Sequence, residues 1–157
     1  MIDKNIEMRG VQMKISTKGR YGLKAMIDLA LNSVNDSVTL KSISERQNIS
    51  EGYLEQIFAS LRKKGLIQGK KGSQGGYILG QSPSDVTVGD ILRALEGELN
   101  LVEFDETKNE DRVEQCINYN VWSKLNKSIN DIVDAITLED LVMKYNTLAN
   151  DVFMYYI

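Results

Sequence analysis

Apolar residues recur at helical spacing along most of the chain, and three such stretches fall in its first half. The first runs from Ser16 to Ser33 and has a wide apolar face, which predicts a buried core helix. A short helix capped by Thr39 comes next, and after a turn of only two residues Ser50 can cap another helix, which closes at Gly65 in a left-handed conformation. Two helices joined by so short a turn form a helix-turn-helix.

A glycine-rich segment with two lysines separates two strand-like stretches, residues 66–68 and 77–79. A β-hairpin directly after the second helix of a helix-turn-helix is a wing, and its cationic tip suits the phosphates or the minor groove of DNA. A phosphate-binding loop is the competing interpretation of these glycines. Neither GxGxxG nor GxxxxGKS/T is present, however, and no helix pattern begins directly after residue 76. The pattern therefore favours a wing.

Helical patterns dominate the second half of the chain. Residues 87–90 form a capping box that opens a helix ending at Gly97. Residues 98–112 are acidic and poorly patterned, which predicts an exposed loop. Near the end, a further capping box at residues 137–140 predicts a short helix, and an apolar string follows at residues 152–157.

Between the acidic loop and this last helix, the spacing predicts a long amphipathic helix. Its apolar stripe is longer than the small remaining core can cover, so we expect it to pack against a second copy of itself. The stripe that we assign to this dimer contact consists of Ile117, Val121, Trp122, Leu125, Ile129, Ile132, Val133 and Ile136. Such a two-fold dimer would place two recognition helices on the half-sites of a palindromic operator.

These patterns predict a mainly α fold with a small β-hairpin, in which a winged helix-turn-helix DNA-binding domain precedes a long dimerisation helix. The DNA-binding domain covers residues 13–97, the acidic loop 98–112, and the dimerisation helix with the C-terminal helix and tail 113–157. Residues 1–12 show no sustained periodicity. We interpret them as a disordered tail or as the product of an upstream start codon ahead of Met13.

The charges are divided unevenly between the two halves. The net charge is −3, yet residues 1–80 contain 13 Lys and Arg against 7 Asp and Glu, and residues 81–157 contain 6 against 15. No acidic residue lies between Gln56 and Ser84, whereas five cations do. This local positive field predicts an anionic partner for the first half, and a solvated basic surface is the simpler alternative.

Composition excludes several kinds of enzyme. The chain has no histidine and one cysteine, Cys116, which rules out histidine-based triads, zinc fingers and intrachain disulfides. Its carboxylates lack the spacing of a paired acid–base site, so we expect no enzyme. No stretch approaches the roughly 18 apolar residues of a membrane span, and the acidic, polar first residues differ from a signal peptide. A cytoplasmic protein is therefore expected.

Several blocks of sequence resemble one family closely. They are Met13–Leu23 at the start, Ser50–Ile57 in the second helix of the helix-turn-helix, Gly75–Tyr77 in the wing, Val88–Ile91 with Glu96–Gly97, and Thr137–Leu141. From Met13 onward the chain resembles the small winged-helix transcription regulators of the Rrf-two class. Many members have Pro-Gly-Gly-Gly where this chain has Ser-Gln-Gly-Gly at residues 73–76, a departure in the wing.

The second helix of the helix-turn-helix is expected to meet base edges with its N-terminal part. Gln56 is the best candidate for base reading, because glutamine can bond adenine N6 and N7 at once. Tyr53 can instead pack in the core, and Glu55 can lie on a solvated face, although the resemblance implies that position 55 filters sequence. The cations at residues 62–64 fit a solvated helix end. The candidates on this helix are Ser50, Glu51, Tyr53, Glu55 and Gln56.

Further DNA contacts are expected on both sides of that helix. Near the start of the first helix, cations and hydroxyl groups suit phosphates, which fix the register on DNA without reading its sequence. These residues are Lys14, Ser16, Lys18, Arg20 and Tyr21. The candidates at the tip of the wing are Lys70, Lys71, Ser73 and Gln74.

The resemblance also bears on cofactors. Members that sense through an iron–sulphur cluster carry three cysteines in the segment before the long helix, and this chain has only Cys116, at the place of the last of them. Tyr119 falls where such members use a histidine ligand. One thiolate cannot hold a cluster that needs four protein ligands, so we expect no metal and no cofactor. The alternatives are a cluster bridged between two subunits, or a redox- or metal-responsive regulator that senses through Cys116.

Within the family, the opening block and the terminal aromatic-Tyr-Ile tail match the branch that represses cysteine metabolism. A terminal isoleucine carboxylate commonly docks into the active site of O-acetylserine thiol-lyase, a pyridoxal-phosphate enzyme that makes cysteine. The resemblance therefore implies that Tyr156 and Ile157 bind this enzyme, which would act as co-repressor when cysteine is plentiful. The simpler alternative is that residues 153–157 pack on the dimer.

Overall fold

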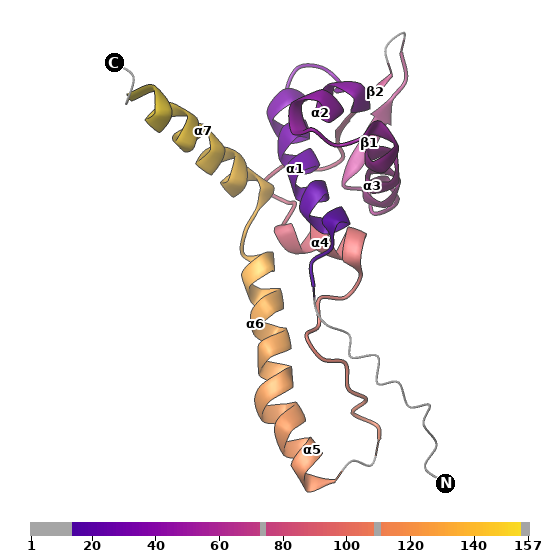
Figure 1. The fold of residues 1–157 in the computed structure, drawn as a ribbon, viewed down its shortest axis with the longest axis vertical. Helices are drawn as coiled ribbons and strands as arrows, with labels where there is room; N and C mark the ends of the chain where they lie inside the picture. The colour runs from indigo at the N-terminus through magenta and orange to yellow at the C-terminus, as the bar shows by residue number, and fades with distance from the viewer. Residues whose placement is uncertain (1–13, 73–74, 109–110, 155–157) are drawn as a thin grey trace.

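The first half of the chain folds as a helix-turn-helix followed by a β-hairpin (Figure 1). This computed structural model describes residues 14–72, 75–108 and 111–154. The elements of the first half are α1 (Thr17–Asn32), α2 (Leu40–Gln47), α3 (Glu51–Lys63), β1 (Ile67–Lys70) and β2 (Gly76–Leu79). The second half contains α4 (Val88–Glu96), α5 (Arg112–Ile117), the π-helical turn η1 (Asn118–Trp122), α6 (Ser123–Asp134) and α7 (Leu138–Met154). The predicted mainly α fold with a small hairpin is confirmed.

The residues predicted to cap the helices do so. The side chain of Thr39 accepts a hydrogen bond from the backbone N–H of Ser42, and that of Ser50 accepts one from Tyr53. Between α2 and α3, Asn48 has a φ of 54°, a left-handed conformation that asparagine adopts more readily than most residues. This conformation ends α2 abruptly, so that α3 begins after a very short turn.

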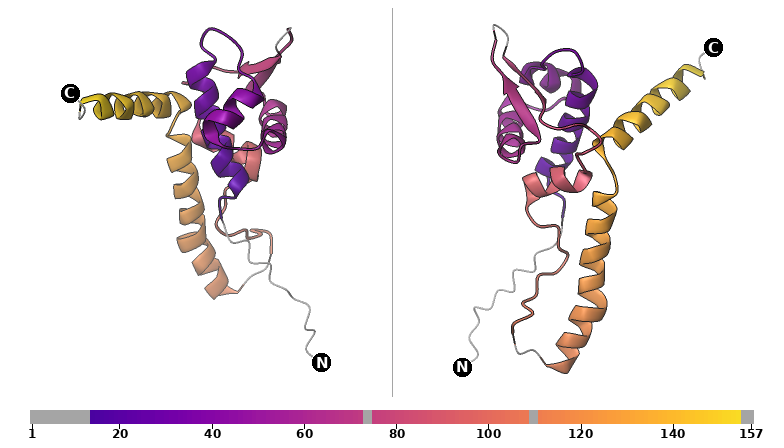
Figure 2. Two further views of the ribbon diagram at one scale, coloured as in Figure 1. Left: turned by 45° about the horizontal axis from the view of Figure 1, so that its top comes forward. Right: turned by 180° about the vertical axis from the view of Figure 1, so that it is seen from behind.

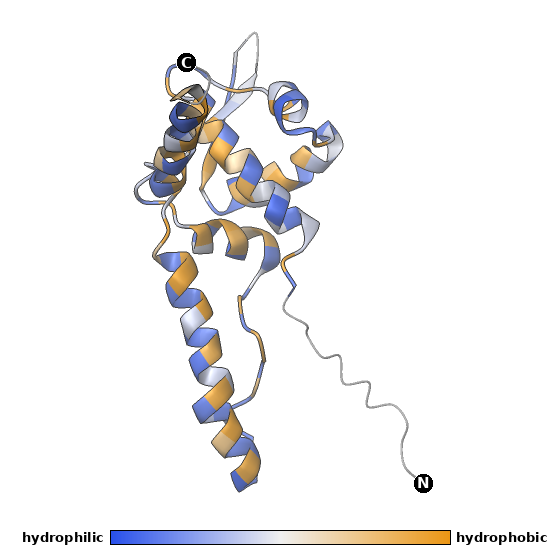
Figure 3. Cartoon of the chain, turned by 60° about the vertical axis from the view of Figure 1, so that its left-hand side comes forward, coloured by the Kyte–Doolittle hydropathy of each residue, from blue (hydrophilic) through white to orange (hydrophobic). Residues whose placement is uncertain are grey.

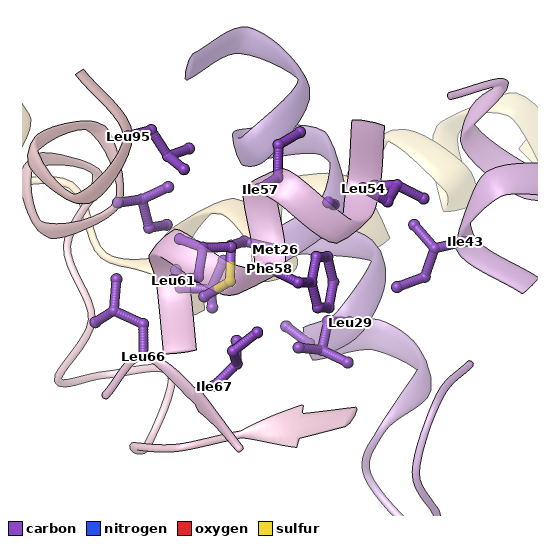
Figure 4. Close-up of a cluster of buried hydrophobic side chains, with 14 of the residues drawn as sticks. Met26, Leu29, Ile43, Leu54, Ile57, Phe58, Leu61, Leu66, Ile67 and Leu95 are labelled. Atoms are coloured by element: carbon purple, nitrogen blue, oxygen red, sulfur yellow. The ribbon is translucent and has the colours of Figure 1, made fainter. Parts of the chain in front are cut away.

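One hydrophobic cluster fills the space between α1, α2, α3 and the hairpin (Figure 4). Helix α3 contributes Leu54, Ile57, Phe58 and Leu61, each no more than 1% exposed. Helix α1 contributes Met26, which is also fully buried. Because the four residues of α3 recur at helical spacing, they occupy one face of the helix, and the opposite face turns to solvent.

A buried carboxylate joins α1 to α2, a feature that the hydrophobic pattern did not predict. Asp28 is 2% exposed and accepts two hydrogen bonds from the guanidinium of Arg46, at 2.9 and 2.7 Å, and one from Gln47 Nε2 at 2.8 Å. The hydrogen bond with Asp28 raises the pKa of Arg46. Charge-assisted bonds of this kind are stronger than neutral ones, so they fix α2 against α1.

Helices α1 and α4 approach each other closely at two glycines of α1. A Cβ atom at Gly22 would overlap the side chain of Leu95, and one at Gly19 would overlap the carboxylate of Glu96. Side chains larger than hydrogen at these positions would push the two helices apart. This close approach gives a physical reason for both glycines in the block Met13–Leu23.

Helix α4 also packs against the C-terminal half of α6. Part of the contact is an apolar cluster that contains the buried residues Val88, Leu92 and Leu99, with Ile129, Val133 and Ile136 packed against them. The other part is polar, because Arg93 donates hydrogen bonds to both carboxylate oxygens of Asp134, at 2.8 Å each. The hydrogen bond from Arg93 holds the pKa of Asp134 below its usual value.

Helices α5, η1 and α6 follow one another directly and form the predicted long helix, which projects from the helix-turn-helix part of the molecule (Figures 1 and 2). Apolar residues are spread along its length (Figure 3). Three residues of the assigned stripe, Val121, Leu125 and Ile132, are 41%, 41% and 61% exposed. The stripe therefore divides into an inner part that packs on α4 within the chain and an outer part that faces solvent. The remaining two residues, Ile117 and Trp122, are half-buried.

The C-terminal helix is longer than predicted. A short helix followed by an apolar string at residues 152–157 was expected, but α7 continues for 17 residues to Met154. The predicted capping box of Thr137 and Asp140 is present, with reciprocal hydrogen bonds of 2.9 and 3.1 Å. No glycine or proline interrupts residues 138–154, so no residue of the usual kind ends the helix earlier. The predicted tail at residues 1–12 and the terminal residues 155–157 lie outside the described residues.

Candidate DNA-binding surface

The outward face of α3 carries the predicted base-reading residues. Glu51, Glu55 and Gln56 are exposed, on the side of the helix opposite the hydrophobic cluster. Ser50 is also exposed, but its hydroxyl oxygen caps the helix by accepting from Tyr53 N at 3.2 Å. The polar side chains on the first two turns of α3 therefore point away from the core together.

Tyr53 lies at the edge of this face rather than on it. Its side chain is half-buried against the core, and its ring meets that of Tyr21 edge-on, with the centroids 5.8 Å apart. The alternative that Tyr53 packs against the core is therefore correct for part of its side chain. The pair places Tyr21 of α1 beside the N-terminal half of α3.

The wing is a two-stranded antiparallel sheet in which Ile67 pairs with Leu79 and Lys70 with Gly76. Tyr77 anchors it, because its backbone N–H and C=O both bond to Val38, at 2.7 and 2.9 Å, and its ring packs edge-on against Phe58. The lysines at 70 and 71 are exposed at the outer end of the hairpin. The candidates Ser73 and Gln74 lie outside the described residues.

A groove of about 920 Å³ lies between the wing, the start of α2 and residues at the two ends of α3. Its walls carry four cations, Lys41, Arg62, Lys70 and Lys71, and one carboxylate, Glu51. The excess of positive charge suits a phosphate backbone. Neither Lys41 nor Arg62 was predicted to belong to such a site, since Lys41 lies in the first turn of α2 and Arg62 was interpreted as part of a solvated helix end. Only the folded arrangement brings them beside the wing.

The other predicted phosphate contacts lie at the start of α1 and just before it. Lys14 and Arg20 are exposed. Lys18 is oriented toward α3, because its Nζ donates to Ser60 Oγ at 3.0 Å. Ser16 has a second role, since its hydroxyl caps α1 and donates to Glu96 Oε1 at 2.5 Å. The hydroxyl of Ser16 is therefore already engaged within the protein, which makes it the weakest of these candidates.

Cys116 lies on the long helix, away from this surface. Its thiol is exposed, and the amide of Asn120 donates to its backbone carbonyl at 2.8 Å and lies 3.8 Å from its sulphur. Among the described residues, no group of three or more Asp, Glu, Cys or His side chains is placed to hold a metal ion. Within residues 14–72, 75–108 and 111–154, no helix combines the length and the hydropathy required to cross a bilayer.

Together, the outward face of α3, the cationic groove and the wing define a winged helix-turn-helix DNA-binding protein. The model of the Rrf2 family, described as an iron-dependent transcriptional regulator, matches residues 15–144, and the chain belongs to this family. The resemblance found in the sequence is thereby confirmed, and so is the expectation that the protein is a transcriptional regulator and not an enzyme.

Comparisons with individual relatives support the assignment to the Rrf2 family. The chain is 41% identical over 145 residues to the HTH-type transcriptional regulator CymR of Bacillus subtilis, covering 92% of this chain and 100% of that protein. The solved structure of B. subtilis CymR, described as a global cysteine regulator, superposes with a TM-score of 0.72 and covers 85% of this chain and 98% of CymR. The structure of T. potens IscR superposes with a TM-score of 0.67 at 47% identity, covering 84% and 88% of the two chains.

The groove can be tested by removing one of its cations. We expect Arg62→Ala to weaken binding to a short random-sequence duplex and to lower the slope of log K against log salt by about 0.9 for each phosphate that the variant no longer neutralises. Fluorescence anisotropy over a salt series measures both. Lys63→Ala is the matched control, because Lys63 is exposed but does not line the groove. Equal slopes for the two variants would contradict the assignment of the groove to phosphates.

Proposed function

We propose that the protein is a repressor of cysteine and sulphur metabolism genes that binds a palindromic operator as a homodimer, with O-acetylserine thiol-lyase as co-repressor. The observation that carries this proposal is the identity of 41% to CymR over the full length of that protein, together with its description as a global cysteine regulator. The terminal Tyr156 and Ile157 add to the similarity, although they lie outside the described residues.

In this proposal the recognition helix is α3, and its exposed first turns enter the major groove. Gln56 reads a base by bonding adenine N6 and N7, and Glu55 rejects sequences that offer no donor such as cytosine N4. The cations of the wing, the groove and the first turn of α1 neutralise phosphates on either side. The support for this arrangement is the common exposure of these side chains around one surface.

The outer part of the apolar stripe supports a dimer. Val121, Leu125 and Ile132 face solvent along the long helix, and α7 adds further exposed apolar residues such as Leu148, which is 67% exposed. Exposed apolar residues gathered along projecting helices are typical of a surface that another chain covers. A second copy packed along this helix would bury them and would set two recognition helices at a fixed separation.

The dimer contact can be broken without disturbing the packing of α6 on α4. Ile132 faces solvent, whereas Ile129 packs on the cluster that joins the two helices. We expect Ile132→Asp to be a folded monomer by light scattering and to lose most of its affinity for operator DNA, because a charge would be buried in an apolar interface. Ile132→Val is the matched control and should remain a dimer. A stable Ile132→Asp dimer would contradict this assignment of the interface.

The co-repressor is proposed to bind the end of the chain. Helix α7 leads away from the DNA-binding part of the molecule, and its last residue, Met154, is 76% exposed (Figure 1). The residues that follow are thus attached to a projecting helix rather than to the core. Such an attachment leaves room for an enzyme to receive the terminal carboxylate.

We expect the purified protein to enrich genomic fragments upstream of sulphur-amino-acid genes, and to do so more strongly when O-acetylserine thiol-lyase is present. Removal of Ile157 should abolish binding of the enzyme in calorimetry and its effect on enrichment, but it should leave the unassisted DNA binding intact. Unchanged affinity of the shortened protein for the enzyme would contradict docking by the tail.

A second candidate function rests on the exposed thiol of Cys116. A regulator of the same fold that senses oxidants or metal ions through this residue would bind DNA with no response to the thiol-lyase. The same enrichment experiment separates the two candidates. DNA binding that ignores the enzyme but disappears when Cys116 is oxidised would favour the thiol sensor.

A further inference from the structure

Glu96, the last residue of α4, holds the first turn of α1. Its Oε1 accepts hydrogen bonds from the backbone N–H groups of Ser16 and Gly19, at 2.9 and 3.0 Å, and from the hydroxyl of Ser16 at 2.5 Å. N–H groups at the start of a helix have no acceptor within the helix itself. A carboxylate also interacts favourably with the positive end of the helix dipole. Glu96 therefore supplies, from a distant segment, a hydrogen-bond acceptor in addition to the Ser16 hydroxyl, whose oxygen lies 3.4 Å from the Gly19 nitrogen.

The turn that Glu96 contacts lies among the predicted phosphate contacts near the start of α1. Lys14 lies two residues before Ser16, and Lys18 and Arg20 lie within the first turns of the helix. A change in the position of this turn would shift the backbone that carries Lys18 and Arg20 and that follows Lys14. The carboxylate of Glu96 approaches the backbone of this turn closely, since a Cβ atom at Gly19 would overlap it.

Glu96 also lies on α4, the helix that contacts α6 of the long helix. Three residues before it, Arg93 donates to Asp134 and, at 2.7 Å, to Asn130 of α6. Helix α4 is thus fixed to α6 by one polar side chain and to the start of α1 by another. The position of the α1 cations relative to the dimer axis depends on both contacts.

We propose that Glu96 is a positioning residue for DNA binding, which fixes the first turn of α1 so that Lys14, Lys18 and Arg20 reach the phosphates. This inference rests on the proposed function, because that function assigns the three cations to DNA. A carboxylate repels a phosphate, so Glu96 cannot raise the affinity by direct contact. Its effect operates through the turn that it holds.

The experiment compares the full-length dimer with Glu96→Ala, using a random-sequence duplex over a salt series. We expect Glu96→Ala to bind about tenfold more weakly at low salt, and its slope of log K against log salt to fall by about 1 to 2 for each protomer, because one or two phosphates are no longer neutralised. Glu98→Ala is the matched control, because it removes the same charge two residues later from an exposed position. We expect its affinity to be unchanged or slightly higher. Glu96→Gln should recover most of the affinity, because an amide oxygen still accepts hydrogen bonds.

Two further readouts separate positioning from a general loss of stability. Amide hydrogen exchange should become faster at Ser16 and Gly19 in Glu96→Ala, while the core amides of α3 keep their protection. In a double-mutant cycle, Glu96→Ala and Arg20→Ala should cost less together than the sum of their separate losses, because both act through the same phosphate contact.

The outcomes are distinguishable. A steep salt dependence in the unmodified protein, with the same slope and affinity in Glu96→Ala, would overturn the positioning role and leave the proposed DNA surface intact. Additive losses in the cycle with Arg20→Ala would also overturn it. A salt-independent unmodified protein would overturn the proposed function itself.

Discussion

The burial of one face of α3 against α1 decides which side chains this protein can present to DNA. Leu54, Ile57, Phe58 and Leu61 are enclosed by the core, so the helix cannot rotate without exposing them. Each side chain of this kind contributes roughly 1.5–3 kcal/mol when it is fully buried, which makes any other rotation of α3 costly. Gln56 and its polar neighbours therefore face outward as a consequence of packing.

Helix α4 connects the helix-turn-helix to the rest of the molecule. It packs closely on α1 at Gly22, reaches the start of α1 through Glu96, and holds the base of α6 through Arg93. The basic first half and the acidic second half of the chain thus meet at α4, and α7 adds a second contact because Leu138 and Val142 belong to the hydrophobic cluster of the first half. In the proposed complex DNA approaches the basic half, and a second copy covers the outer part of the stripe, Val121, Leu125 and Ile132, which faces solvent.

The sequence predicted the features that depend on neighbouring residues. Helix starts at Thr39 and Ser50, the wing, and the capping box at Thr87 follow from local periodicity and capping chemistry, and the structure confirms them.

Features that depend on residues far apart were missed, because no local pattern encodes them. The ion pair of Asp28 with Arg46 spans 18 positions and the contact of Ser16 with Glu96 spans 80. The division of the apolar stripe was missed for the same reason, since periodicity cannot tell which part of a helix its own chain will cover. Likewise, only the fold brings Lys41 and Arg62 beside the wing.

The most direct test of the account asks whether the outward face of α3 reads bases. Binding-site selection from random duplexes should yield a palindrome with unmodified protein. Gln56→Ala should select the same palindrome with relaxed preference at one position in each half-site, at a cost of about 1–3 kcal/mol in discrimination and with little change in binding to random DNA. An unchanged preference at every position would contradict the claim that this face of α3 reads the operator.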